Sequence, residues 1–380
     1  MLIHTWSRKH AVKNIALVGG GKIGQVIADL LVHSGDYRVT VIDRAPAGLQ
    51  LAPHPALQTL QLDVADTRAL TLALKDQFAV LSAAPFHVTG RIAEAAHAAG
   101  VHYLDLTEDV ANTRRVRMLA ATARSAFIPQ CGLAPGFITI VGHDLAGRFE
   151  QLQDVRLRVG ALPQYPSNAL NYNLTWSTEG VINEYCEPCE EIADGKLRLA
   201  PPLEEREEFS LDGVTYEAFN TSGGVGTLCE TLAGKVQNLN YRTIRYPGHA
   251  AIMKALLHDL RLRDRRDVLR DVLENALPTT LQDVVIVFVT VTGMRGGKLT
   301  QETYANKIYG QTVNGVERSA IQITTASGIC AVLDLLAHDQ LPQRGFVRQE
   351  DVRLDDFLRN RFGHAYATVP QRRAQMPYVA

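Results

Sequence analysis

The sequence lacks the features that direct a chain to a membrane, a polyanion or an oxidising compartment. Its five cysteines are odd in number and scattered over 380 residues, so a disulfide scaffold is not expected. The formal net charge is −1, which gives no reason to expect nucleic acid or a membrane surface as a partner. The longest strongly apolar run, residues 284–291, is far shorter than the roughly 18 residues of a membrane span. Residues 1–13 lack a continuous apolar core and indicate a frayed extension, not a secretory leader, so we expect a cytoplasmic protein.

Metal-ligand clusters are also missing. Cys186 and Cys189 form one Cys-x-x-Cys pair, but a zinc knuckle needs a second ligand pair at suitable spacing, and none is obvious. The twelve histidines include no His-Glu-x-x-His cluster. We expect no metal, and metal binding or redox chemistry at the cysteine pair is the minor alternative.

Strand and helix patterns alternate from residue 14 to about 130, which is typical of a parallel sheet covered on both faces. Strands are expected at residues 15–18, 39–43, 57–62, 78–83, 103–105 and 126–128. Ligands of such sheets bind outside the carboxyl ends of the strands. Asp43, Asp63, Ala84, Asp105 and Cys131 are therefore expected at one edge.

The pattern changes beyond about residue 150. Residues 154–160, 208–219 and 284–292 indicate strands of a mixed or antiparallel sheet, and Asn314-Gly315 indicates a hairpin between residues 304–309 and 317–324. Residues 261–275 and 328–337 indicate helices. The predicted fold class is α/β, with a Rossmann-type doubly wound parallel sheet plus an α+β domain with a mixed or antiparallel sheet.

A glycine fingerprint gives the most specific indication of a ligand. Gly19, Gly21 and Gly24 follow the first strand at the spacing of a dinucleotide-binding loop, where they permit a tight turn, close approach of a pyrophosphate and helix packing. Asp43 stands 19 positions after Gly24, as expected for a carboxylate that binds the adenosine ribose. It favours NAD over NADP, although the adjacent Arg44 could accommodate a 2′-phosphate. The remaining candidate cofactor contacts are Lys22, Ile23, Asp63, Val64, Ala83, Ala84 and Pro85.

Several motifs in order resemble those of one family. They are Gly-Gly-Gly-Lys-Ile-Gly, the Asp105-Leu-Thr segment, Cys131-Gly-Leu-Ala-Pro-Gly136, Trp176-Ser-Thr-Glu-Gly180, Asn220-Thr-Ser-Gly-Gly224 and Arg245-Tyr-Pro-Gly-His249. Together they resemble the saccharopine dehydrogenase superfamily, most of all its lysine 6-dehydrogenase branch. The resemblance implies an NAD(P)-dependent oxidoreductase that acts on a carbon–nitrogen bond and is commonly dimeric. It implies a Rossmann domain at 1–130, a substrate-binding and dimerisation domain at 131–328, and helices at 329–380 that pack back on the Rossmann domain.

One position bears on the substrate. Saccharopine-forming relatives carry an arginine where this chain has Glu179, and a glutamate suits an ammonium rather than a carboxylate. Arg245 could then hold the single carboxylate of lysine. The alternatives are a structural ion pair for Glu179 and a domain-interface salt bridge for Arg245. Tyr172 and Trp176 are candidate pocket walls, although aromatic residues at such spacing are more often core.

Oxidation of an amine requires a group that takes its proton. Asp105, at a strand end beside the expected nicotinamide, is the first candidate general base, and His249 is the second. Both could instead be structural. Cys131 is expected to shape the pocket without acting as a nucleophile. The preferred hypothesis is oxidative deamination of L-lysine at its ε-carbon. The alternatives are a saccharopine or carboxynorspermidine-type dehydrogenase, or a nucleotide-sensing protein without catalysis.

Overall fold

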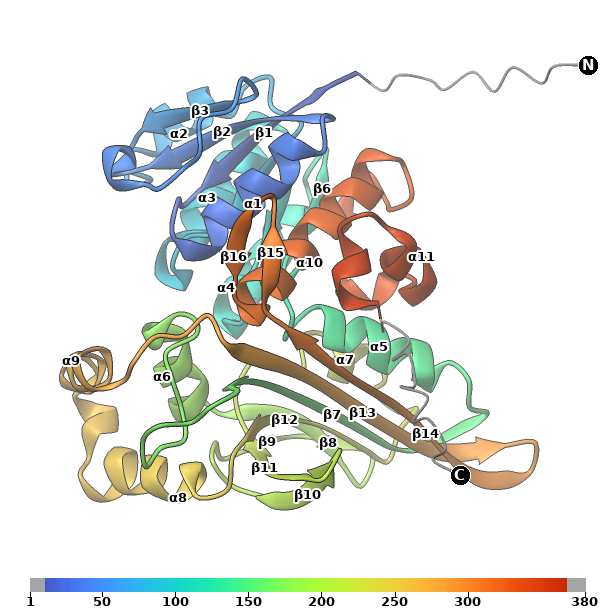
Figure 1. The fold of residues 1–380 in the computed structure, drawn as a ribbon. Coiled ribbons are helices and arrows are strands. Elements are labelled where there is room, and N and C mark those ends of the chain that lie inside the picture. Colours follow the sequence, from blue (N-terminus) through green and yellow to red (C-terminus); the bar gives the residue numbers. More distant parts are fainter. Residues whose placement is uncertain (1–10, 368–380) are drawn as a thin grey trace, which may run out of the picture.

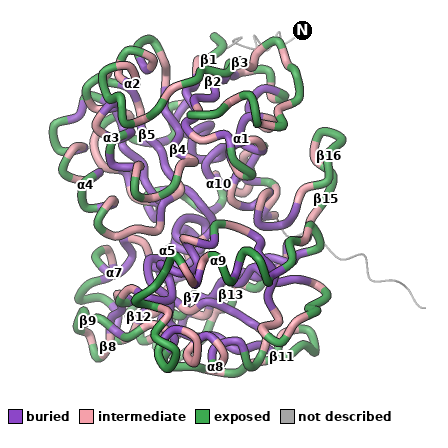
Figure 2. The backbone as a smooth tube through the Cα atoms, turned by 90° about the vertical axis from the view of Figure 1, so that its left-hand side faces the viewer, coloured by how far each residue is buried: buried purple, intermediate pink, exposed green. Residues whose placement is uncertain are grey.

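The computed structural model describes residues 11–367, so most of the predicted N-terminal extension lies outside the described residues. Figure 1 shows two lobes, one above the other, each built around a sheet. The buried segments run through the strands of both sheets (Figure 2). The two-sheet α/β architecture predicted from the sequence is confirmed.

The upper sheet is fully parallel and carries the Rossmann pattern. Its strand order is β17-β6-β5-β4-β1-β2-β3. The strands are β1 (Lys13–Val18), β2 (Tyr37–Asp43), β3 (Leu57–Gln61), β4 (Ala79–Ser82), β5 (His102–Asp105), β6 (Ala126–Ile128) and β17 (Gly345–Phe346). The helices between them are α1 (Lys22–His33), α2 (Thr67–Ala73), α3 (Phe86–Ala99) and α4 (Val110–Ala120).

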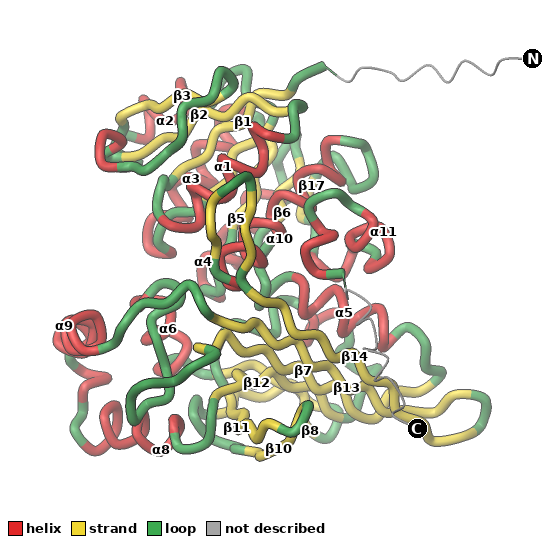
Figure 3. The backbone as a smooth tube through the Cα atoms, in the orientation of Figure 1, coloured by secondary structure: helices red, strands yellow, loops and turns green. Residues whose placement is uncertain are grey.

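The lower sheet is mixed, as predicted, and its order is β10-β11-β12-β7-β13-β14 (Figure 3). Only β12 and β7 run parallel along this path. Its strands are β7 (Gln151–Pro163), β8 (Cys189–Ala193), β9 (Lys196–Ala200), β10 (Glu207–Leu211), β11 (Val214–Asn220), β12 (Asn238–Arg245), β13 (Asp283–Arg295) and β14 (Lys298–Tyr309). The accompanying helices are α5 (Phe137–Ala146), α6 (Thr178–Cys186), α7 (Leu228–Thr231), α8 (His249–Lys254) and α9 (Arg266–Ala276).

Two strand predictions are corrected. Residues 208–219 form a hairpin of β10 and β11, because Asp212 and Gly213 both adopt positive φ and turn the chain. The Asn314-Gly315 turn does join two strands, but these are the short β15 (Gln311–Val313) and β16 (Val316–Arg318). Residues 304–309 instead belong to β14, and residues 320–324 start a helix.

That helix, α10 (Ala320–Ala337), begins eight residues earlier than the apolar pattern predicted. Ser319 and Gln322 form a capping box, and Asp283 accepts hydrogen bonds from the amides of Ala320 and Ile321. The helix is long and apolar enough to cross a membrane, yet 94% of it is buried inside the fold. We therefore interpret it as a core helix.

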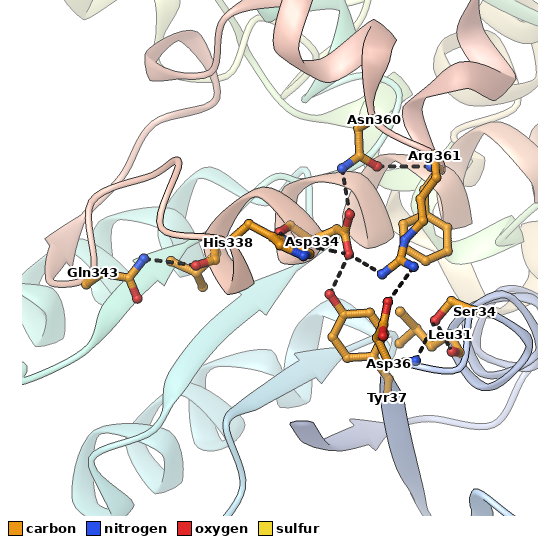
Figure 4. Close-up of polar contacts among 11 residues, drawn as sticks. Leu31, Ser34, Asp36, Tyr37, Asp334, His338, Gln343, Asn360 and Arg361 are labelled. Atoms are coloured by element: carbon orange, nitrogen blue, oxygen red, sulfur yellow. Dashed lines mark hydrogen bonds and ion pairs between the residues drawn. The ribbon is translucent and has the colours of Figure 1, made fainter. Parts of the chain in front are cut away.

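The C-terminal segment is fastened to the Rossmann sheet by a buried carboxylate. Asp334, on α10, accepts hydrogen bonds from the Tyr37 hydroxyl and the Arg361 guanidinium, each at 2.6 Å, and from Asn360 at 2.8 Å (Figure 4). Arg361 also pairs with Asp36 at 2.6 Å. Asn360 and Arg361 directly follow α11 (Leu354–Arg359). The network therefore joins the segment after α11 to α10 and to the start of β2. The segment contributes a strand, β17, as well as helices.

Candidate functional site

A cavity of about 490 Å³ lies where the carboxyl ends of the Rossmann strands meet the lower sheet. Such a volume is within the usual range for small-molecule sites. Its lining from the upper lobe includes Gly19, Gly21, Ile23, Asp43, Ala83, Ala84, Pro85, Thr107, Glu108, Gly132, Leu133 and Ala134. Its lining from the lower lobe and α10 includes Val159, Ala161, Trp176, Glu179, Gly180, Glu184, Tyr241, Thr243, Arg245, Ile321 and Thr325.

The glycine loop has the close contacts that its spacing implies. Gly19 has φ +96°, and a Cβ there would lie 2.7 Å from the Ala83 carbonyl oxygen. A Cβ on Gly24 would lie 2.0 Å from the Gly19 carbonyl oxygen, so α1 packs directly on the turn. A Cβ on Gly21 would meet nothing within 4 Å, which leaves open space in front of the α1 N-terminus. This loop therefore fits the pyrophosphate of a dinucleotide.

Asp43 stands at the end of β2 and holds the same loop. Its Oδ2 accepts a hydrogen bond from Gly20 N at 2.8 Å, and its Oδ1 accepts one from Ala45 N at 2.9 Å. A carboxylate has acceptor capacity beyond these two bonds, which suits ribose hydroxyls. The predicted contacts Lys22, Arg44, Asp63 and Val64 lie outside the cavity lining, and all but Val64 are exposed.

The structure places Asp105 behind the cavity wall. Its carboxylate is fully buried and accepts hydrogen bonds from Tyr103 OH, Gln130 N and Thr107 N at 2.7, 2.8 and 3.1 Å. Burial raises the pKa of Asp105 to about 6, while these bonds oppose the shift. Asp105 does not line the cavity and ties together the ends of β5 and β6. This geometry favours the structural role that the sequence analysis left open for Asp105, and its role as general base stays a prediction.

Cys131 is likewise behind the wall. Its thiol lies 3.0 Å from the Ile128 carbonyl oxygen and 3.2 Å from Gln349 Nε2, and burial raises the pKa of Cys131 far above its ordinary value. A thiol held in this way is a poor nucleophile. It acts on the site through the following residues, Gly132 to Ala134, which do line the cavity.

Arg245 is the buried cation of the site and ends β12. A chain of hydrogen bonds orients its side chain. Arg245 Nε donates to Tyr185 OH at 2.9 Å, and Tyr185 OH lies 3.1 Å from His249 Nε2. His249 Nδ1 lies 2.8 Å from the Leu170 carbonyl oxygen, which can only accept, so Nδ1 carries the proton and Nε2 accepts from Tyr185. The ring of Tyr172 covers the guanidinium, 4.9 Å from Cζ to the centroid.

His249 is therefore a poor base in this setting. Burial, with the charge of Arg245 adding to it, lowers the pKa of His249 to about 3. Neither His249 nor Tyr172 lines the cavity. These positions favour the structural alternatives for both residues, since His249 and Tyr172 both support Arg245. Direct roles for them stay predictions.

Two carboxyl groups that the sequence analysis did not single out line the cavity. Glu108 follows β5, and Glu184 lies on α6 with 6% of its surface exposed. Burial raises the pKa of Glu108 to about 7 and that of Glu184 well above its ordinary value. The spacing of Gly180 and Glu184 was the signal that could have found Glu184, because residues four apart on a helix share a face.

Glu179 also lines the cavity, but it already has a partner. Its carboxylate pairs with Arg270 of α9 at 3.2 Å, and both side chains are 40% exposed. Trp176 lines the cavity and packs its ring on Gly180, where a Cβ would lie 2.3 Å from the indole. The Trp176–Gly180 motif therefore forms one wall by close packing.

Comparisons with known proteins place this architecture in a family. The model of the saccharopine dehydrogenase NADP-binding domain matches residues 15–128, and that of the saccharopine dehydrogenase C-terminal domain matches residues 132–361. The chain is 24% identical over 268 residues to the Saccharomyces cerevisiae saccharopine dehydrogenase [NADP(+), L-glutamate-forming]. That match covers 66% of this chain and 59% of the yeast protein.

A solved structure shows the same fold. The apo saccharopine dehydrogenase (L-Glu forming) from Saccharomyces cerevisiae superposes with a TM-score of 0.72 at 18% identity, over 89% of this chain and 94% of that one. The resemblance expected from the motifs is thus confirmed at the level of the superfamily. Because the two family models together match most of its length, the chain belongs to the saccharopine dehydrogenase family.

Proposed function

We propose that this oxidoreductase deaminates L-lysine at its ε-carbon, which yields 2-aminoadipate 6-semialdehyde and ammonia. The observation that carries the proposal is the charge pattern beside the glycine loop. Among the described lining residues Arg245 is the one arginine or lysine, and Glu108 and Glu184 share the cavity with it. One cation and two carboxyl groups complement the single carboxylate and two amino groups of lysine.

The positions of these groups support the assignment. Arg245 is held in place and 3% exposed, which suits a fixed site for the α-carboxylate. Among the described residues neither Glu108 nor Glu184 forms an ion pair, although the charge of Arg245 acts on Glu184, whereas Glu179 is engaged by Arg270. The ammonium-binding role that the sequence suggested for Glu179 therefore passes to the two deeper glutamates. Glu179 is left to shape the more exposed part of the lining.

Saccharopine is the second candidate substrate, because the yeast relative is named for it. Its glutamyl half adds carboxylates that need further cationic partners. The described cavity lining offers Arg245 alone for them. A carboxylated polyamine matches the two glutamates but is longer than lysine. On charge grounds lysine is the better match.

The glycine loop and Asp43 would hold the dinucleotide, whose nicotinamide, when bound, accepts the hydride lost by the substrate carbon. We propose NAD as the preferred form, because the Asp43 carboxylate stands where a 2′-phosphate would carry like charge. The cavity between the two lobes shields the amine from bulk water. That shielding strengthens each charge interaction within it.

The test is a substrate panel with NAD and NADP. Lysine, ornithine, cadaverine and saccharopine are each supplied to the enzyme, and formation of the reduced cofactor is followed by absorbance. We expect turnover with lysine and little with saccharopine. Turnover with saccharopine alone would move the protein to the sister activity, and tight cofactor binding with no turnover across the panel would favour a nucleotide sensor.

A further inference from the structure

The two cavity glutamates come from different lobes and are positioned by one loop. This loop is the Asn220–Gly224 motif, which follows β11. The Ser222 amide donates to the backbone carbonyl of Glu184 at 3.0 Å. Gly223, with φ +84°, lies so close to Glu108 that a Cβ there would be 2.4 Å from the Glu108 carbonyl oxygen. The motif therefore brings Glu108 and Glu184 to the same part of the cavity.

The Glu184 side chain lines the cavity with 6% of the residue exposed, and its carboxyl forms no hydrogen bond or ion pair with another of the described residues. Arg245 and Glu108 are the charges that act on it. A carboxyl that lines a cavity without a protein partner is free to take a hydrogen bond from a ligand. Two carboxyls that share one cavity rarely ionise together, because their like charges repel.

We propose that Glu108 and Glu184 form a carboxyl pair that holds one proton and takes a second from the substrate ammonium. Glu184 keeps the first proton, and Glu108 is the base. The substrate N–H bond breaks, its electron pair stays on nitrogen, and a new O–H bond forms on Glu108. The nitrogen lone pair is then free to form the imine, and the pair later releases its proton to solvent. This inference rests on the proposed amine oxidation and names the base of that same site.

The surroundings of the pair support this assignment. Burial raises the pKa of Glu108 to about 7, where a base works well near neutral pH, and the charge of Glu108 helps to raise the pKa of Glu184 further. Arg245 opposes the shift of Glu184. The other titratable groups nearby are Asp105 and Asp109 beside Glu108, and Tyr172, Tyr185, Tyr241 and Cys189 beside Glu184.

The first test needs no substrate. In an NMR titration with isotopically labelled glutamate, Glu108→Gln should lower the pKa of Glu184, because the like charge is removed. Glu187→Gln is the matched control: Glu187 caps the same helix, lies outside the cavity and pairs with Arg266. An unchanged Glu184 titration in Glu108→Gln would show that the two carboxyls do not share a proton.

Stability gives a second substrate-free readout. Folding raises the pKa of Glu108 from 4.5 to about 7, so the native state binds more protons than the unfolded state across that window. The free energy of unfolding should therefore fall as pH rises through it. Glu108→Gln should reduce this slope, leaving the contributions of Asp105 and Glu184, whose pKa values burial also raises, whereas Glu187→Gln should keep it. A slope equal to that of the wild type in Glu108→Gln would count against the pair.

Activity separates this inference from the proposed function. With lysine, Glu108→Gln should lower kcat about 100-fold and remove the acidic limb of the kcat/KM profile near pH 7. If lysine is turned over and the kcat of Glu108→Gln stays within threefold of the wild-type value, as that of Glu187→Gln should, the carboxyl pair is refuted while the proposed function stands. If lysine is not turned over but the two carboxyls titrate together, the function fails while the pair stands.

The loop provides an independent variant. Gly223→Ala should push Glu108 away and reproduce much of the loss in kcat. Gly213→Ala is the control, because Gly213 has a similar positive φ of +77° and a Cβ there meets nothing within 4 Å. Equal effects of the two substitutions would show that backbone strain alone accounts for the loss.

Discussion

The two walls of the cavity recognise their ligands by different means. The Rossmann wall presents mainly backbone and small side chains around the glycine loop, with Gly19, Gly21, Ala83 and Ala84 in its lining, and Glu108 is its charged exception. The lower wall presents large functional side chains, among them Trp176, Glu184, Tyr241 and Arg245. Backbone recognition depends on which residues are small at fixed spacings, so it is visible in a sequence. Side-chain recognition depends on which distant elements fold together.

This contrast predicts that substitutions in each wall affect a different ligand. The largest effect is expected for Arg245→Met. Removing the one cation from a buried site should lower kcat/KM for lysine on the order of 1,000-fold and leave the dissociation constant of NADH within twofold. Steady-state kinetics and calorimetry measure the two quantities.

Arg242→Met is the matched control. Arg242 lies on the same strand and pairs with Glu205 and Glu207 outside the cavity. If Arg245→Met weakens NADH binding by as large a factor as it lowers kcat/KM for lysine, the two walls do not bind separate ligands.

The complementary change is Gly24→Ala in the Rossmann wall. Its Cβ would lie 2.0 Å from the Gly19 carbonyl oxygen, which has to shift and carry the glycine loop with it. We expect the dissociation constant of NADH to rise about 100-fold by calorimetry, from overpacking of roughly 1–3 kcal/mol. Gly147→Ala is the control, because Gly147 has φ −62° and the nearest atom to its Cβ is 3.5 Å away. An unchanged dissociation constant of NADH in Gly24→Ala would show that the glycine loop does not bind the cofactor.

Tyr185→Phe tests whether the lower wall is positioned by residues behind it. The change leaves Arg245 Nε and His249 Nε2 without a partner, at roughly 1–3 kcal/mol, so KM for lysine should rise about 30-fold. Kinetics with cadaverine, which lacks the carboxylate, should change little. Tyr246→Phe removes a hydroxyl that bonds the Pro163 carbonyl and serves as control. An equal loss with both amines would mean that Tyr185 supports the fold alone.

The smallest effect is expected for Asp43→Asn, which sharpens the description of the cofactor side. The amide cannot accept at both positions or repel a phosphate, so the ratio of NADH to NADPH affinity should fall about tenfold. Asp63→Asn is the control, because the Asp63 carboxylate is exposed and caps only Ala65 N at the end of β3. An unchanged ratio of NADH to NADPH affinity would show that Asp43 does not determine which cofactor is preferred.

The same contrast explains what could be predicted from the sequence. Sequence patterns located β1 to β6 within a residue or two, because these strands are short runs bounded by turns. They missed β17, which has only two residues. Periodicity misread residues 208–219 as one strand, since Asp212-Gly213 supplies the turn without interrupting the alternation. The start of α10 was missed because its cap depends on Asp283, 37 residues away.

Within the site, position on a strand end was not sufficient to assign chemistry. Asp105 and Glu108 are three residues apart, yet one is satisfied by three donors and the other faces the cavity. His249 carries a residue type suited to proton transfer, but burial beside Arg245 removes that capacity. These differences arise from tertiary contacts, and no local pattern encodes them.

Helix α10 contacts both the cavity and the start of β2. Near its start, Ile321 and Thr325 line the cavity. In its middle, Gly328 lies so close to the backbone of residues 131–132 that a Cβ would be 2.7 Å from the Cys131 carbonyl oxygen. Near its end, Asp334 accepts a hydrogen bond from Tyr37. At 18 residues it spans about 27 Å as one strut. One helix therefore connects the cavity lining to the start of β2, so a substitution that shifts α10 should move both places together.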